Sequence, residues 1–204
     1  AEECNNKAKY IASKTGFFDT LFTTQEDIFE EASNLYSKAA NHYRLAKMWK
    51  EAGDAYVNSA DLLKKCKNTL NRIMLQHAID CYLILPHTDE NFELVKMHTL
   101  NVIELLETDF NKIGKLYETL GDYYINDINS IKYYEKALEY YDACGNSNYT
   151  KQTCINKMAT LHVNNKNYND GAKLFQQIAS LSKLRMITIG FQHIKHLTNA
   201  FICH

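Results

Sequence analysis

The sequence predicts an all-α fold of about nine helices that pair into antiparallel hairpins. Three observations support this: a helical signature that occurs twice, a scarcity of helix breakers, and apolar side chains at helical spacing. The signature Trp49-Lys50-Glu51-Ala52-Gly53-Asp54-Ala55-Tyr56 begins at residue 49 and returns 68 residues later as Tyr117-Glu118-Thr119-Leu120-Gly121-Asp122-Tyr123-Tyr124. That interval is about two tetratricopeptide periods of roughly 34 residues. We therefore expect a tetratricopeptide-like right-handed superhelix, in which each glycine lets a neighbouring helix approach closely.

The composition fits long helices and argues against several functions. The 204 residues include one proline and seven glycines, and 46% are apolar. A formal net charge of −1 disfavours bulk nucleic-acid binding, and no apolar run is long enough to span a bilayer. The acidic start is unlike a signal peptide. Three cysteines in apolar helical surroundings are predicted to be reduced thiols of a cytosolic protein: Cys81, Cys154 and Cys203.

The first hairpin can be placed from its start and its connection. Residues 1–14 are predicted to form a short helix, and residues 15–24 a loop bounded by Gly and Thr. Thr24 followed by Gln25-Glu26-Asp27 is typical of a helix start, with a capping side chain and acids in the first turn. The helix that follows reaches a short connection at 45–48. A second helix begins at Trp49, and so brief a connection makes the two antiparallel.

The remaining elements follow from apolar spacing between turn signals. Pro86 and the polar residues after it mark a turn, and the stretches 107–109, 145–148 and 164–167 mark others. The expected helices are 69–85, 90–106, a helix lined by Ile113 and Tyr124, a helix lined by Ile131 and Tyr141, 149–163, 168–182, and a last one with Met186, Ile189, His193, Leu197 and Phe201.

The end of the chain bears on domain organisation. The last predicted helix runs into Phe201-Ile202-Cys203-His204 without a glycine, a cap or a polar tail. A helical solenoid usually ends in a capping repeat with a polar outer face. We therefore expect residues 1–204 to form a single α-solenoid that is the N-terminal part of a longer protein.

Several motifs, in order along the chain, resemble one family. Gly16-Phe17-Phe18-Asp19-Thr20-Leu21-Phe22 is similar to a Gly-Phe-Phe-x-x-Leu-Phe loop, and residues 36–49 resemble Tyr-x-Arg-Ala-Ala-Asn-x-Phe-x-x-Ala-Lys-x-Trp. Residues 131–141 and 168–175 resemble two later helices of the same proteins. The chain thus resembles the alpha-SNAP family, the soluble N-ethylmaleimide-sensitive-factor attachment proteins, from about residue 10 to 182.

The aromatic loop near 15–24 has two interpretations. Large apolar side chains on a loop near a terminus have little core to enter, and each gains roughly 1.5–3 kcal/mol on full burial. The resemblance implies that this loop contacts the membrane, through Phe17, Phe18, Leu21 and Phe22. The alternative is that the same side chains pack on the first hairpin.

The resemblance also implies a basic face for a partner. The family uses basic residues on its concave face to hold the acidic surface of a SNARE four-helix bundle, including syntaxin-like members. The corresponding positions here are Lys115, Lys151 and Lys157, with a further basic site near Lys195, whereas an arginine of the family pattern is Asp109. The alternative is that these are solvated surface lysines. Attraction of this kind should weaken with salt.

The function implied by the resemblance is that of an adaptor without a cofactor. It would bind assembled SNARE bundles in vesicle fusion and recruit a hexameric N-ethylmaleimide-sensitive-factor-type AAA ATPase, at the cytosolic face of membranes. The ATPase contact would lie in a C-terminal region that this chain lacks. No phosphate-binding loop, nucleophile elbow or zinc-site spacing is present, so neither an enzyme nor a metal site is expected. The rivals are a tetratricopeptide co-chaperone that clamps a peptide carboxylate and a structural scaffold.

Overall fold

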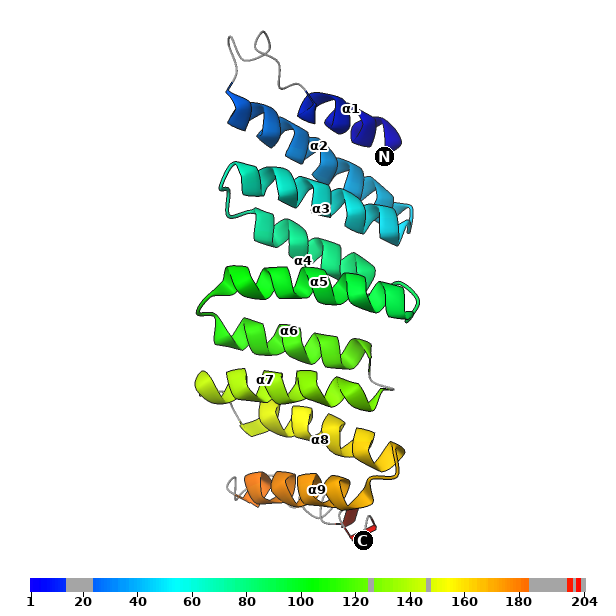
Figure 1. Ribbon diagram of the computed structural model, residues 1–204, viewed down its shortest axis with the longest axis vertical. Helices are drawn as coiled ribbons and strands as arrows, with labels where there is room; N and C mark the ends of the chain where they lie inside the picture. The colour runs from blue at the N-terminus through cyan, green and yellow to red at the C-terminus, as the bar shows by residue number, and fades with distance from the viewer. Residues whose placement is uncertain (14–23, 125–126, 146–147, 184–197, 200, 203–204) are drawn as a thin grey trace. The chain divides into compact units, whose positions relative to one another are not determined.

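Helices account for almost all of the described chain. The computed structural model describes residues 1–13, 24–124, 127–145, 148–183, 198–199 and 201–202, where nine α-helices, one 3₁₀-helix and no strand occur (Figure 1). The α-helices are α1 (Glu2–Ala12), α2 (Gln25–Leu45), α3 (Trp49–Lys65), α4 (Asn71–Tyr82), α5 (Asp89–Leu106), α6 (Phe110–Tyr123), α7 (Ile131–Ala143), α8 (Asn148–Asn164) and α9 (Tyr168–Lys183). The predicted all-α, tetratricopeptide-like class is confirmed.

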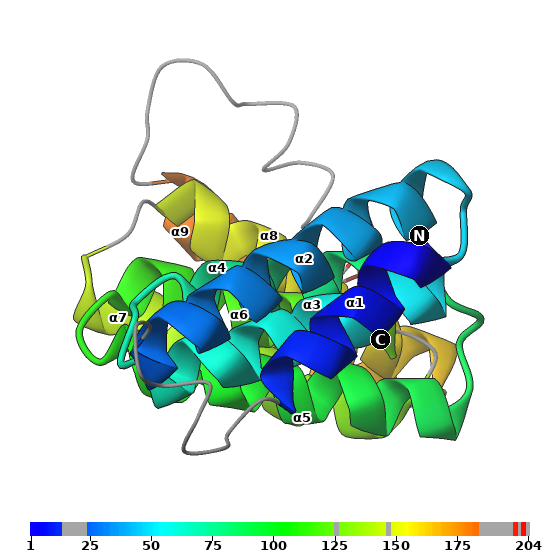
Figure 2. The same ribbon diagram turned by 90° about the horizontal axis from the view of Figure 1, so that it is seen from above.

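The chain divides into two compact units, Ala1–Leu105 (unit 1) and Leu106–His204 (unit 2). In unit 1, α2 packs against α1 and α3, and α3 packs against α4, while Figures 1 and 2 both show α1 alongside α2. In unit 2, α7 packs against α6 and α8, and α8 packs against α9. That residues 1–204 form one solenoid stays a prediction.

The predicted start of the second helix is confirmed by its hydrogen bonds. The Thr24 hydroxyl accepts from the Asp27 backbone N–H at 3.2 Å, and the Asp27 carboxylate accepts from the Thr24 N–H at 3.1 Å. This reciprocal pair satisfies two N–H groups that the first turn would otherwise leave without partners. The same hydrogen bonds from Thr24 hold the pKa of Asp27 below its usual value.

Three connections turn by the same backbone device at lysines. Lys47, Lys67 and Lys166 have φ values of +59°, +53° and +63°. In each case the N–H of the next residue returns to a carbonyl five positions back, as in the bond of 2.9 Å from Met48 to Tyr43. This is a helix C-terminal motif in which glycine is usual. Of these turns, the sequence predicted the one at 164–167 from its polarity and the one at 45–48 as a short connection, and no signal predicted the one at Lys67.

The core of each unit is built from small and aromatic side chains. In unit 1, Ala39, Ala40 and Ala52 are completely buried, which allows α2 and α3 to pack closely. In unit 2 the largest fully buried side chains include Tyr134 and Tyr141.

The cysteine and C-terminal predictions have mixed outcomes. Cys81 and Cys154 are buried free thiols, as predicted, and burial raises the pKa of Cys154 to about 12. Cys203 and most of the last predicted helix lie outside the described residues. Phe201 is described and is exposed.

Candidate functional site

The predicted lysines of unit 2 lead to a polar cluster on three consecutive helices. Two glycines of α6 seat two tyrosines of α7: a Cβ at Gly121 would lie 2.7 Å from the Tyr134 ring, and a Cβ at Gly114 would lie 2.6 Å from the Tyr141 ring. The Tyr134 hydroxyl donates to Asp122 at 2.8 Å, and the Tyr141 hydroxyl donates to Glu118 at 2.9 Å. The absence of side chains at the glycines thus lets each ring reach a carboxylate on the opposite helix.

Lys157 of α8 completes this cluster. Its Nζ lies 2.7 Å from Glu118 Oε1 and 2.7 and 2.8 Å from the two oxygens of Asp122. The same ammonium lies 5.8 Å from the centroid of the Tyr134 ring, within the range of a cation–π contact. The side chain of Lys157 is only 24% exposed, and that of Glu118 is 5% exposed. We call Gly121, Asp122, Tyr134 and Lys157 the unit 2 seam.

The charges in this cluster stabilise one another. Burial alone would raise the pKa of Glu118, but hydrogen bonds from Lys157, Lys115 and Tyr141 outweigh it and hold the pKa below its usual value. Burial alone would lower the pKa of Lys157, but its bonds to Asp122 and Glu118 raise it. Both groups therefore stay ionised near neutral pH. A charged pair this far from water remains favourable only with its hydrogen bonds in place.

The structure separates the three lysines predicted to bind a partner. Lys115 is 67% exposed, and its Nζ contacts Glu118 Oε2 at 3.0 Å from the solvent side. Lys157 lies behind it in the unit 2 seam. Lys151 of α8 is 18% exposed and forms an ion pair with Asp142 of α7. Lys115 and Lys157 share one carboxylate and therefore belong to one cluster, whereas Lys151 pairs elsewhere.

Of two other predicted features, one lies within the described residues. Asp109, which the resemblance places at a basic position of the family pattern, is the N-cap of α6: its carboxylate accepts from the Lys112 N–H at 3.2 Å. This local role explains an acid at that position. The four apolar residues predicted to contact a membrane, Phe17, Phe18, Leu21 and Phe22, lie outside the described residues. The described part of the chain has no helix both long and apolar enough to cross a membrane.

Unit 1 contains a counterpart of this seam. Gly53 of α3 seats Tyr82 of α4, where a Cβ would lie 2.2 Å from the ring, and the Tyr82 hydroxyl donates to Asp54 at 2.8 Å. The third helix, α5, contributes His98, whose ring stacks on Tyr82 with centroids 5.5 Å apart and an interplanar angle of 24°. We call these four residues the unit 1 seam. Its third helix supplies a histidine where unit 2 supplies a lysine.

Sequence reasoning missed the carboxylates and tyrosines of both seams. The signal was present, because aspartate follows glycine in both copies of the repeated signature, as Asp54 and Asp122. What it lacked was the partner, since each tyrosine comes from the next helix at a different separation: 28 residues to Tyr82 and 12 to Tyr134.

Helix hairpins with glycine-seated tyrosines place the chain among tetratricopeptide-like proteins, and a solved structure agrees. A signal transduction ATPase with numerous domains and a tetratricopeptide repeat sensor, from Pyrococcus horikoshii, matches all of this chain with 32% of its own, at a TM-score of 0.56 and 16% identity. That likeness concerns the fold alone. The family model for the soluble NSF attachment proteins matches residues 1–204, so the chain belongs to that family.

Curated relatives carry the same family name. The chain is 24% identical to the alpha-soluble NSF attachment protein of Mus musculus, with 95% of this chain and 65% of the relative covered. It is 26% identical to the beta-soluble NSF attachment protein of Bos taurus, with 96% and 65% covered. It is 26% identical to the alpha-soluble NSF attachment protein of Vitis vinifera, with 99% of this chain and 67% of the relative covered. The chain thus spans about two thirds of the length of these relatives.

Proposed function

We propose that this chain is an adaptor that binds assembled SNARE bundles and brings to them the hexameric ATPase that takes them apart. The observation that carries the proposal is the family match over residues 1–204. The adaptor acts in vesicle fusion and intracellular protein transport, at the cytosolic face of membranes. It supplies binding surfaces and no chemistry of its own, so it is not an enzyme.

The proposed SNARE contact centres on Lys115. Its side chain is the most exposed of the three predicted lysines at 67%, and its ammonium reaches Glu118 from solvent, so it can turn to an acidic partner while Lys157 keeps Glu118 paired. Lys151 and Lys157 add positive charge beside it, but each is already paired within the protein. We therefore expect Lys115 to contact acidic side chains of the bundle directly, while Lys157 mainly maintains the surface that carries Lys115.

The proposed membrane contact is the loop near 15–24. Phe17, Phe18, Leu21 and Phe22 supply large apolar groups, and burial of a few such groups at a bilayer surface gives weak, reversible attachment. This contact would increase the local concentration of the adaptor at membrane-anchored bundles. It would add to the SNARE contact without replacing it.

The proposed share of this region in disassembly is limited. The resemblance implies that the ATPase is contacted by the C-terminal end of these proteins, and residues 1–204 match about 65% of the mouse relative. We therefore expect residues 1–204 to bind SNARE bundles but to support little disassembly by the ATPase. Full activity of residues 1–204 in a reconstituted disassembly assay would contradict this.

The test is binding to a purified ternary SNARE complex at low and high salt, with and without liposomes. We expect saturable binding that weakens as salt screens the charges. Lys115→Glu should weaken it at low salt. The control is Lys173→Glu on α9, because Lys173 is 74% exposed and also forms an i,i+3 ion pair, with Asp170, and circular dichroism of both variants would establish that each is folded.

The membrane arm uses the same assay. Liposomes should tighten binding of the wild type but not of a Phe17→Ser/Phe18→Ser variant. An absence of binding at low salt without liposomes would overturn the proposal, and chaperone C-terminal peptides would become the next ligands to test.

A further inference from the structure

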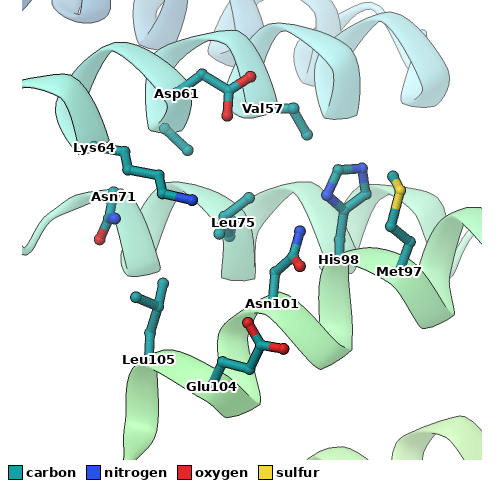
Figure 3. A pocket seen from close by; sticks show the side chains of 11 residues that line it. Val57, Asp61, Lys64, Asn71, Leu75, Met97, His98, Asn101, Glu104 and Leu105 are labelled. Atoms are coloured by element: carbon teal, nitrogen blue, oxygen red, sulfur yellow. The ribbon is translucent and has the colours of Figure 1, made fainter.

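A groove in unit 1 lies between α3, α4 and α5, next to the unit 1 seam. Its volume is about 280 Å³. Figure 3 shows Asp61 and Lys64 extending from α3, and His98 and Asn101 rising from α5, toward the space around Leu75 of α4. Small-molecule sites usually occupy about 300–1,000 Å³. This groove is therefore suited to one long side chain more than to a cofactor.

The groove contains a buried polar atom without a partner. His98 is only 5% exposed, and its Nδ1 has no hydrogen-bond partner in the structure. A buried polar group without a partner costs about 1–3 kcal/mol, so such atoms are rare unless something else satisfies them. Burial lowers the pKa of His98, so its ring is neutral at pH 7 and one ring nitrogen can accept a hydrogen bond.

The charged side chains at the rim are exposed and have no ion-pair partner among the described residues. They are Asp61, Glu104 and Lys64. Two carboxylates face one ammonium, which leaves the rim with an excess negative charge. The walls are partly apolar, with Leu75 buried and Met97 49% exposed.

We propose that this groove binds the side chain of an arginine on a partner polypeptide. The methylene stem would lie along Leu75 and Met97, and the guanidinium would reach Asp61 and Glu104. Its planar fork offers five N–H donors, enough to bond a carboxylate and still donate to the His98 ring. Lys64 would meet an acceptor group on the same polypeptide. This mixture of charges disfavours a bare metal ion, and no group of three metal-ligating side chains occurs in the described residues.

The unit 2 seam shows how the protein itself holds a cation beside a tyrosine ring and carboxylates. There, Lys157 lies over a tyrosine ring and between two carboxylates of the first helix of the seam. In unit 1 the third helix places the neutral His98 over the ring, and the seam carboxylate, Asp54, pairs with Lys50 of its own helix at 3.0 Å. Asp61, further along α3 in the groove, forms no ion pair among the described residues, and an arginine would supply a cation to it. The inference does not depend on the proposed SNARE contact, which involves unit 2.

The test uses residues 1–204 and N-acetyl-arginine methylamide as the probe, observed by NMR at the His98 ring nitrogens and the Met97 methyl group. We expect saturable shifts at both positions in the millimolar range. The citrulline analogue has the same shape without the charge and should bind at least about tenfold more weakly, because charge-assisted hydrogen bonds are the stronger ones. Asp61→Asn/Glu104→Gln should weaken arginine binding by a similar factor.

The matched control is Glu31→Gln. Glu31 is an exposed carboxylate of unit 1 on α2, which does not line the groove, so this variant should bind the probe like the wild type. Circular dichroism would establish that each variant is folded. Equal binding of arginine and citrulline, stronger binding of N-acetyl-glutamate methylamide, or no shift at all would overturn the proposal. Shifts that depend on protein concentration without probe would indicate a second copy as the occupant and would also overturn it.

Discussion

In both units a tyrosine packs on a glycine of the preceding helix and donates to the aspartate that follows this glycine. The two units differ in the residue that the third helix places against the tyrosine. Lys157 in unit 2 pairs with Glu118 and Asp122, so every charge of that cluster has a partner. His98 in unit 1 stacks on Tyr82 and retains a ring nitrogen without a partner. The repeated signature therefore specifies how two helices meet. The third helix decides whether a lysine or a neutral histidine meets that tyrosine, and in unit 1 the cation beside the seam carboxylate Asp54 is Lys50 of the same helix.

The largest expected effect is the loss of the lysine that closes the unit 2 seam. Lys157→Met should lower the free energy of unfolding of unit 2 by about 3 kcal/mol, because it removes the cation of Asp122 and leaves buried Glu118 with only the exposed Lys115. Urea unfolding followed by hydrogen exchange in α6–α8 would measure it. Lys115→Met removes an exposed partner of the same Glu118 and should cost less than about 1 kcal/mol. Equal effects of the two substitutions would contradict this account.

Replacing the seam glycines by alanine should lower the stability of both units, and that of unit 1 more. Gly53→Ala would place a methyl group 2.2 Å from the Tyr82 ring, and Gly121→Ala would place one 2.7 Å from Tyr134. We expect losses of about 1–3 kcal/mol, larger at Gly53, since overpacking forces rings and helices apart. Thermal unfolding of the two variants gives the comparison. Gly145 has open space around it and a φ of +67°, so Gly145→Ala tests backbone strain alone. Gly53→Ala unfolding like the wild type would refute close packing at this contact.

The two units should also respond differently to acid. Burial holds the pKa of His98 below its usual value of 6.5, so the unfolded chain takes up a proton first as pH falls. Unit 1 should therefore lose stability from about pH 6.5 downward, by at most about 1.4 kcal/mol per pH unit from this group. Glu118 has a pKa below its usual 4.5, so its stabilisation of unit 2 persists above that pH and is lost as pH falls through the folded-state pKa.

Amide exchange between pH 7 and 5 would reveal this difference. Protection corrected for intrinsic exchange should fall in α4 and α5 while α6–α8 change little. His98→Phe keeps a ring on Tyr82 and should remove the dependence. If α6–α8 lost as much protection as α4 and α5 in the wild type, the contrast between the units would be wrong.

The smallest expected effect concerns the lysine turns. Lys47→Gly should stabilise unit 1 by about 0.5 kcal/mol, because Lys47 has a φ of +59°, which favours glycine. Chemical unfolding would show a modest rise in midpoint. Lys38→Gly, at an exposed position in the middle of α2, should instead destabilise by about 1 kcal/mol. A loss of stability in Lys47→Gly would mean that the lysine side chain itself matters at the turn.

Much of the fold could be predicted from the sequence, because its signals are local. Thr24 and Asp27 marked the start of α2, and the glycines of the repeated signature predicted the close approach that Gly53 and Gly121 make. The short 3₁₀-helix Ile128–Ser130 was not predicted. It depends on the Asp127 side chain, which accepts from the Asn129 N–H at 2.8 Å.

The site was less predictable, because its contacts join distant residues. Lys157 bonds Glu118 across 39 residues of sequence. The sequence therefore identifies the lysine but does not indicate which carboxylates pair with it. The groove beside His98 likewise requires three helices to be in place. Sequence alone thus selected lysines as candidates and left their partners open.

The most direct test of the contrast between the seams is NMR detection of lysine ammonium protons near neutral pH. Lys157 Nζ lies within 2.8 Å of three carboxylate oxygens, whereas Lys64 has no ion pair among the described residues. We expect a slowly exchanging signal from Lys157, which disappears in Glu118→Gln/Asp122→Asn, and none from Lys64. Exchange at Lys157 as fast as at Lys64 would contradict this, because the seam of unit 2 would then not hold its own cation.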